Sequence, residues 1–155
     1  MIDLFKKFQD VIKALNKRNV DYILIGGYAV ILYGMPRLTQ DLDLIIKMDH
    51  SNIKNFRYAL EDVFKDDEIK EITFDELKKY AVIRYGCPDG FYIDVMAGIG
   101  EVADYDSINF ETKVFKGSFV KIATPEALFE LKKNTVRPED KRDARFLKSL
   151  IEKGG

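Results

Sequence analysis

The first residues of this chain that could do chemistry are two aspartates, Asp41 and Asp43, which stand in an otherwise apolar segment. In a β-strand, residues two apart point to the same face and lie about 6.6 Å apart along the strand. The two carboxylates would then project together, while Leu42 and Leu44 face the core. Aspartate is disfavoured in strands, and two like charges side by side repel each other. A divalent cation removes this repulsion, so the pair predicts a metal site.

A glycine pair, Gly26-Gly27, lies upstream of the aspartates and directly follows an apolar run. Residues without a Cβ let a phosphate approach the backbone, and a helix that begins there offers unpaired N–H groups at its positive end. Arg37 and Thr39 stand between the glycines and the aspartates and would add a guanidinium fork and a hydroxyl. In this order, the residues predict a site for a metal-bound polyphosphate.

Each part of this pattern also has an ordinary structural explanation. A glycine pair before a helix can be a tight turn, and Asp-x-Asp can be the solvated face of an edge strand. The ordered set favours the functional interpretation. Other motifs fit less well, because Ile45 and Ile46 stand where an EF-hand loop needs oxygen ligands and a glycine. The sequence also lacks the Gly-Lys-Ser/Thr of a Walker A loop and the G-x-G-x-x-G fingerprint.

The elements that must position these residues can be read from the apolar periodicity. Around the candidate site, the pattern predicts a helix over 3–18, a buried strand over 22–25, a short helix over 28–33, a loop from 35 to 40 and a second strand over 41–46. Further along, it predicts a helix over 52–64 with Ser51 as its N-cap, a strand over 69–74, hairpins over 80–96 and 112–123, and helices over 125–133 and 138–152.

The bulk composition is that of an ordinary globular protein. The chain has 155 residues, 46% hydrophobic and 33% charged, which suits a single domain over residues 1–155. A formal net charge of −1 gives no long-range attraction to nucleic acid. The single cysteine, Cys87, excludes an internal disulfide and a cysteine zinc site, and His50 is the only histidine. Without an apolar run near ~20 residues or a signal-peptide pattern, we expect a cytoplasmic protein with no membrane segment.

The motif resembles that of minimal nucleotidyltransferases of the DNA polymerase β-like superfamily, and most closely the branch of AbiEii-type toxins and antibiotic nucleotidyltransferases. That signature is a strand, Gly-Gly or Gly-Ser, a short helix, a spacer, and Asp-x-Asp between apolar residues. Here Gly26-Gly27 and Arg37-x-Thr39-x-Asp41-Leu42-Asp43-Leu44 match it, with thirteen residues between Gly27 and Asp41. The resemblance implies a mixed α/β (α+β) fold, in which a short mixed sheet packs against helices and C-terminal helices flank the cleft.

The resemblance also implies further site residues. A third carboxylate on a later strand corresponds to Asp94, for which pairing with Arg84 is the structural alternative. Near the C-terminus, Lys132 followed by Arg137-Pro138-Glu139-Asp140-x-x-Asp143 is similar to the branch's Lys…Arg-Pro-Lys-Asp-x-x-Asp segment, with a glutamate at the usual second lysine. Lys132 is therefore a candidate nucleotide ligand. The spacing favours the competing interpretation, a solvated helix face with ion pairs between residues three and four apart.

The function implied by the resemblance is transfer of a nucleoside monophosphate from an NTP to an acceptor hydroxyl, with release of pyrophosphate. Asp41, Asp43 and Asp94 would hold two Mg²⁺ ions, or Mn²⁺, as catalytic and metal-binding residues. Gly26, Gly27, Arg37, Thr39 and Lys132 would bind the nucleotide. The acceptor is a small molecule, a protein or RNA, and a partner protein or a second copy could complete the assembly. Two alternatives stay open: a catalytically silent nucleotide-binding or toxin–antitoxin module on the same fold, and a metal-dependent glycosyltransferase.

Overall fold

The computed structural model describes residues 3–154, so residues 1, 2 and 155 at the ends of the expected domain lie outside it. Along the chain the elements are α1 (Leu4–Lys17), β1 (Tyr22–Ile25), α2 (Gly26–Leu32), β2 (Asp41–Ile46), α3 (His50–Val63), the 3₁₀-helix η1 (Asp67–Glu71), α4 (Phe74–Lys79), β3 (Ile83–Gly86), β4 (Tyr92–Met96), β5 (Gly98–Ile99), β6 (Ala103–Asp104), β7 (Phe110–Phe115), β8 (Ser118–Ala123), α5 (Pro125–Lys132) and α6 (Pro138–Glu152).

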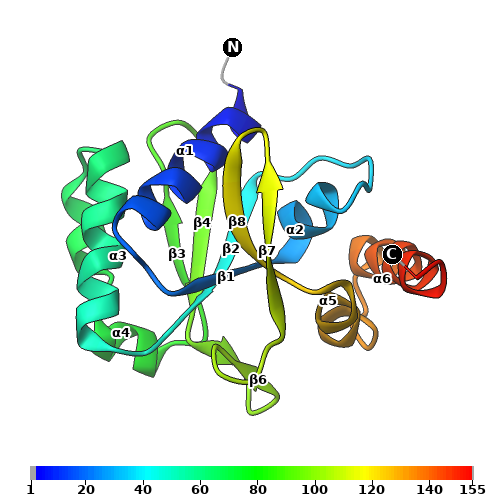
Figure 1. Ribbon diagram of the computed structural model, residues 1–155. Coiled ribbons are helices and arrows are strands. Elements are labelled where there is room, and N and C mark those ends of the chain that lie inside the picture. Colours follow the sequence, from blue (N-terminus) through cyan, green and yellow to red (C-terminus); the bar gives the residue numbers. More distant parts are fainter. Residues whose placement is uncertain (1–2, 155) are drawn as a thin grey trace.

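A mixed six-stranded sheet in the order β3-β4-β2-β1-β8-β7 forms the centre of the molecule (Figure 1). The pairs β2–β4 and β1–β8 are parallel, whereas β1–β2, β3–β4 and β7–β8 are antiparallel. A separate small hairpin joins β5 to β6. The strands that carry the glycine turn and the aspartates, β1 and β2, are therefore central, with β4 beside them. This arrangement confirms the predicted mixed sheet packed against helices.

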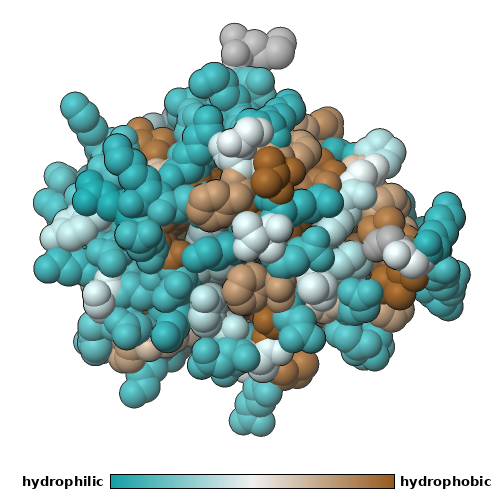
Figure 2. All heavy atoms as spheres, in the orientation of Figure 1, coloured by the Kyte–Doolittle hydropathy of each residue, from teal (hydrophilic) through white to brown (hydrophobic). Residues whose placement is uncertain are grey.

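Helices pack on the sheet in two groups. In Figure 1, α1 and α3 lie together on the left and α2, α5 and α6 on the right, and the corresponding pairs of helices contact each other. The core between these layers is built from the fully buried strands and from the apolar stripe of α1, including Phe8, Val11 and Leu15. Most of the face shown in Figure 2 is hydrophilic, with apolar patches near its middle. The core thus holds in position β1, β2 and β4, the strands that carry or adjoin the residues of the candidate site.

Two of the predicted local features are wrong. The N-cap of α3 is Asp49, whose carboxylate accepts hydrogen bonds from the N–H groups of Ser51 and Asn52, so the helix begins earlier than the predicted Ser51 cap. The predicted strand over 69–74 is instead η1 followed by α4. Asp66 and Thr73 cap these two helices through their side chains, and such local hydrogen bonds outweigh the short β-like run between them.

Both predicted hairpins are confirmed. In the β3–β4 hairpin, the N–H of Gly90 donates to the carbonyl of Cys87 over 3.0 Å, which closes a turn with Pro88 at its second position. The β7–β8 hairpin turns at Lys116 and Gly117, which both have positive φ. The first hairpin matters for function, because it places β4 and its aspartate next to β2.

Candidate active site

The register of three neighbouring strands brings two of the predicted aspartates side by side. Ile25 at the end of β1 is opposite Asp43 on β2, and Asp43 is opposite Asp94 on β4. Leu42 and Leu44 are fully buried, whereas Asp43 is partly accessible, which is the alternation expected from the sequence. Asp41 lies on the same face as Asp43, two residues earlier. The candidate carboxylates therefore occupy one end of the sheet centre.

The glycine pair is required by its contacts with the site. Gly26 has a φ of +77°, and a Cβ on it would overlap the Oδ2 atom of Asp43. A Cβ on Gly27 would lie 3.2 Å from the guanidinium carbon of Arg37. The backbone turn from β1 into α2 is thus pressed against one of the carboxylates and against an arginine.

We expect Gly26→Ala to destabilise the protein by about 2–4 kcal/mol, because it adds a steric overlap with Asp43 to the cost of left-handed backbone. Gly90→Ala is the matched control, since Gly90 has a φ of +88° and nothing within 4 Å of its Cβ position. The control should lose only about 1–2 kcal/mol. Urea unfolding of both variants checks this, and equal losses would show that contact with Asp43 has no energetic consequence.

The carboxylates are electrostatically coupled. Burial raises the pKa of Asp43 to about 7, and the negative charges of Asp94 and Asp41 add to this effect. The charge of Lys132 acts in the opposite direction and lowers the pKa of Asp43. Asp43 is therefore the carboxylate that most needs a cation, and Lys132 is close enough to influence it.

Arg84 pairs with Asp94, as the structural alternative from the sequence predicts. Its Nε and Nη2 atoms donate to the two oxygens of Asp94, each over 2.9 Å. The same guanidinium lies 3.4 Å from Asp41 Oδ2 and 4.5 Å from the centroid of the Tyr92 ring. Arg84 thus bridges two of the three predicted metal ligands.

Lys132 belongs to a buried network of charges between α5 and α6, and the interpretation of this segment as a solvated helix face is wrong. Its Nζ donates to Asp140 and to Asp143, each over 2.9 Å. Asp143 is fully buried and also accepts from Nη1 of Arg37 over 2.5 Å, while Arg137 donates to Asp140 over 2.8 Å. Helical spacing contained the missed signal, because the buried face of α6 is Asp140, Asp143, Ala144 and Leu147.

The two loop residues predicted to bind phosphate lie on opposite sides of this arrangement. Arg37 is held by Asp143 and rests against Gly27, at the start of α2. Thr39 accepts a hydrogen bond from the N–H of Asp41 over 3.2 Å, so its hydroxyl fixes the backbone that carries the first aspartate. Both residues are therefore attached directly to elements of the candidate site.

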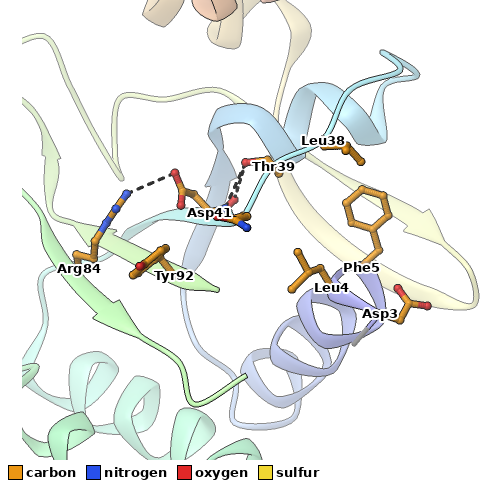
Figure 3. Close-up of a pocket in the computed structure, with 9 residues that line it drawn as sticks. Asp3, Leu4, Phe5, Leu38, Thr39, Asp41, Arg84 and Tyr92 are labelled. Carbon is orange, nitrogen blue, oxygen red and sulfur yellow. Dashed lines mark hydrogen bonds and ion pairs between the residues drawn. The ribbon is translucent and has the colours of Figure 1, made fainter. Parts of the chain in front are cut away.

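A cavity of about 1130 Å³ opens beside Asp41. Figure 3 shows Leu4 and Phe5 of α1 on one wall, with Arg84 and Tyr92 across from them beyond Asp41. Its remaining lining residues are Asp3, Leu38, Thr39 and Gln40. The cavity combines apolar walls with charged groups at the carboxylates, which is typical of a small-molecule site.

Within residues 3–154, histidine, cysteine and acidic side chains do not already converge as a group of three around a metal position. The donors nevertheless fit a divalent cation, because Asp43 and Asp94 are register partners and Asp43 senses the charges of both other aspartates. Hard oxygen ligands of this kind suit Mg²⁺ or Mn²⁺. Both oxygens of Asp94 accept hydrogen bonds from the guanidinium of Arg84.

A mixed central sheet, with a glycine turn on one strand and Asp-x-Asp on the next, defines a nucleotidyltransferase-like protein. Over residues 4–155 the chain matches the family model described as "Nucleotidyl transferase of unknown function (DUF2204)", and it belongs to that family. No curated protein matches it significantly in sequence. Among residues 3–154, none of the helices has the length and apolar character needed to cross a membrane.

Solved structures share the fold. An antigenic nucleotidyltransferase-like protein from Paracoccidioides brasiliensis has a TM-score of 0.62 and 23% identity, over 95% of this chain and 76% of that one. The lincomycin-bound lincosamide adenylyltransferase LnuA has a TM-score of 0.62 and 18% identity, over 93% and 96%. ANT(2″)-Ia in complex with adenylyl-2″-tobramycin has a TM-score of 0.53 and 15% identity, over 94% and 88%. At these identities the likeness shows a common fold.

Proposed function

We propose that this protein transfers a nucleoside monophosphate from an NTP to an acceptor hydroxyl and releases pyrophosphate. The observation that carries the proposal is the position of Asp43. It lies against Gly26 on one side and is the register partner of Asp94 on the other. A phosphate approaching the glycine turn would therefore meet the carboxylates directly. Membership in a nucleotidyl transferase family supports this class of reaction.

The three aspartates would hold two Mg²⁺ ions, or Mn²⁺. When bound, such ions stabilise the charge on the transferred phosphate and on the attacking and leaving oxygens. Asp94 lies on β4, which is farther from the glycine turn than β2. It would accept the proton of the acceptor hydroxyl. Asp41 and Asp43 lie between that strand and the turn and would face the triphosphate.

Positive charge for the triphosphate would come from the opposite side of the glycine turn. Arg37 rests against Gly27, and the charge of Lys132 reaches Asp43. Asp143 holds both cations in place through hydrogen bonds from each. Arg37 and Lys132 would neutralise the phosphates, while Gly26 and Gly27 let them approach the backbone. The hydroxyl of Thr39, which accepts a hydrogen bond from the N–H of Asp41, would help to orient the phosphates.

The acceptor would enter through the cavity beside Asp41, because Asp41 and Arg84, the partner of Asp94, both line it. A hydroxyl there would lie next to the carboxylates that would hold the metal ions. Small molecules fit this cavity, and two of the structural neighbours were solved with lincomycin and with adenylyl-tobramycin. A protein or RNA acceptor, and a partner subunit, are the other outcomes that the assay below distinguishes.

A catalytically silent nucleotide-binding or toxin–antitoxin module is the second candidate. The observation in its favour is the bidentate pair between Arg84 and Asp94, which neutralises a carboxylate without any metal. A silent module would bind NTP through the glycine turn and the cations and would transfer nothing.

The test is incubation with Mg²⁺ or Mn²⁺ and each α-labelled NTP, separately over pools of small molecules, proteins and RNA. We expect label to be transferred to one pool, with release of pyrophosphate. Asp41→Asn should reduce transfer at least 100-fold, because it removes a metal ligand from the site. NTP binding without transfer would favour the silent module. If neither NTP nor metal binds the intact protein, the proposed function is wrong.

A further inference from the structure

Arg84 is placed where it can block the candidate metal site. Both oxygens of Asp94 accept hydrogen bonds from its guanidinium, which leaves the carboxylate engaged in a fork-to-fork pair. A third contact reaches Asp41, which lies on the neighbouring strand. The carboxylate of Asp94 is largely buried, with 12% of its side chain exposed, so it cannot easily turn toward other partners.

The side chain of Arg84 lies at the surface of the molecule, beside a cavity that could accept it. The side chain of Arg84 is 52% exposed and comes from β3, an edge strand of the sheet. It rests on the ring of Tyr92, and both residues line the cavity beside Asp41. A rotation into this cavity would carry the charge away from Asp94 without disturbing the core.

We propose that Arg84 is a tethered competitor of the divalent cation, which binds Asp94 only in molecules whose guanidinium has moved into the cavity. The inference rests on the proposed function, because it assumes that Asp94 is a metal ligand. The fork takes one lone pair of each Asp94 oxygen and places a positive charge beside the position where the metal ion would bind, so the guanidinium and the metal ion compete for this carboxylate. The apparent metal affinity is then reduced by the fraction of molecules in which Asp94 is free.

The test is Mn²⁺ binding to the intact protein, measured by electron paramagnetic resonance and calorimetry without nucleotide. Arg84→Met removes the charge and keeps an unbranched apolar side chain beside Tyr92. We expect it to bind Mn²⁺ about tenfold more tightly or better. Arg84→Lys keeps the charge but cannot form the two-bonded fork with Asp94, so we expect a smaller increase in Mn²⁺ affinity. If Arg84→Met fails to fold, Arg84→Lys alone still decides the direction.

A double-mutant cycle separates competition from a general effect of charge. In an Asp94→Asn background, the Arg84→Met substitution should no longer tighten Mn²⁺ binding, because the contested carboxylate is gone. An equal gain in that background would overturn the proposal in favour of long-range electrostatics. Unchanged affinity in both Arg84 variants, beside a wild-type protein that binds Mn²⁺, would overturn it while leaving the proposed function intact. If no form binds Mn²⁺, the metal site itself is wrong and the inference falls with it.

A direct readout comes from the Nε–H signal of Arg84 in nuclear magnetic resonance. In the metal-free protein this hydrogen should be protected, since it is held by Asp94 over 2.9 Å. Titration with Mg²⁺ should release it at the same midpoint as metal binding. Protection that persists at saturating Mg²⁺ would contradict displacement of the guanidinium.

Discussion

Asp43→Asn should reduce the rate of nucleotidyl transfer about 1000-fold or more, and yet make the metal-free protein more stable above neutral pH. The loss of activity follows from the central position of this carboxylate between the glycine turn and Asp94. The gain in stability follows from the neutral amide, which avoids the cost of burying a charge and does not repel Asp94 and Asp41. Activity and stability therefore change in opposite directions in a single variant.

The pH dependence of this effect has a definite sign. The pKa of Asp43 is about 7 in the folded protein, mainly through burial and then through its acidic neighbours. In the unfolded chain an aspartate has a pKa of about 3.9. The stabilising contribution of the protonated group is therefore fully present below about pH 4 and is lost as the pH rises through 7. Asparagine does not titrate, so the difference between variant and wild type should be largest above pH 7.

Thermal unfolding in EDTA at pH 5.5 and pH 8 measures this difference. We expect Asp43→Asn to gain about 1 kcal/mol or more at pH 8, which is roughly 2–4 °C for a chain of this size. Asp67→Asn is the matched control, because the side chain of Asp67 is 99% exposed. An Asp43→Asn protein no more stable than wild type at pH 8 would contradict the raised pKa of Asp43 in the folded protein.

Asp143→Ala should be the most destabilising of these substitutions, at about 3–5 kcal/mol. Its side chain is fully buried, and its Oδ2 atom accepts hydrogen bonds from both Arg37 and Lys132. Removing it leaves Arg37 without an ion-pair partner and Lys132 with Asp140 alone among residues 3–154. An unpaired cation in that position is costly because it has lost both water and its counter-ion.

Urea unfolding at pH 7 gives the free energy for this prediction. Glu139→Ala in the same helix is the control, because Glu139 makes only a 3.7 Å contact with the exposed Arg137 and should change stability little. Asp143→Asn should fall between the two, since it keeps the shape and an acceptor but not the charge. If Asp143→Ala costs no more than the control, the network does not support the fold.

Much of the fold followed from the sequence because its signals are local. The sequence predicts the run from β1 through the glycine pair to β2 and the two C-terminal helices nearly to the residue. It also predicts both hairpins, although their first strands begin at Ile83 and Phe110 and not at 80 and 112. Three kinds of signal determine structure within a few residues of their own position. These are the apolar periodicity, the helix start at Thr124-Pro125 and the turn at Pro88. The errors over 66–79 and at Ser51 arose where side-chain caps competed with a short apolar pattern.

The sequence indicates which residues belong to the candidate site better than it indicates which of them contact each other. The sequence by itself determined which carboxylates share a strand face, because alternation in a β-strand is a property of the backbone. Only the tertiary structure decided that Asp94 stands opposite Asp43 and that Asp143 joins Arg37 to Lys132 across 106 and 11 residues of chain. These contacts depend on strand order and helix packing, which no local spacing encodes. The glycine and aspartate pattern thus located the candidate site in the sequence, whereas the ion-pair partners of its charged residues were set by the tertiary fold.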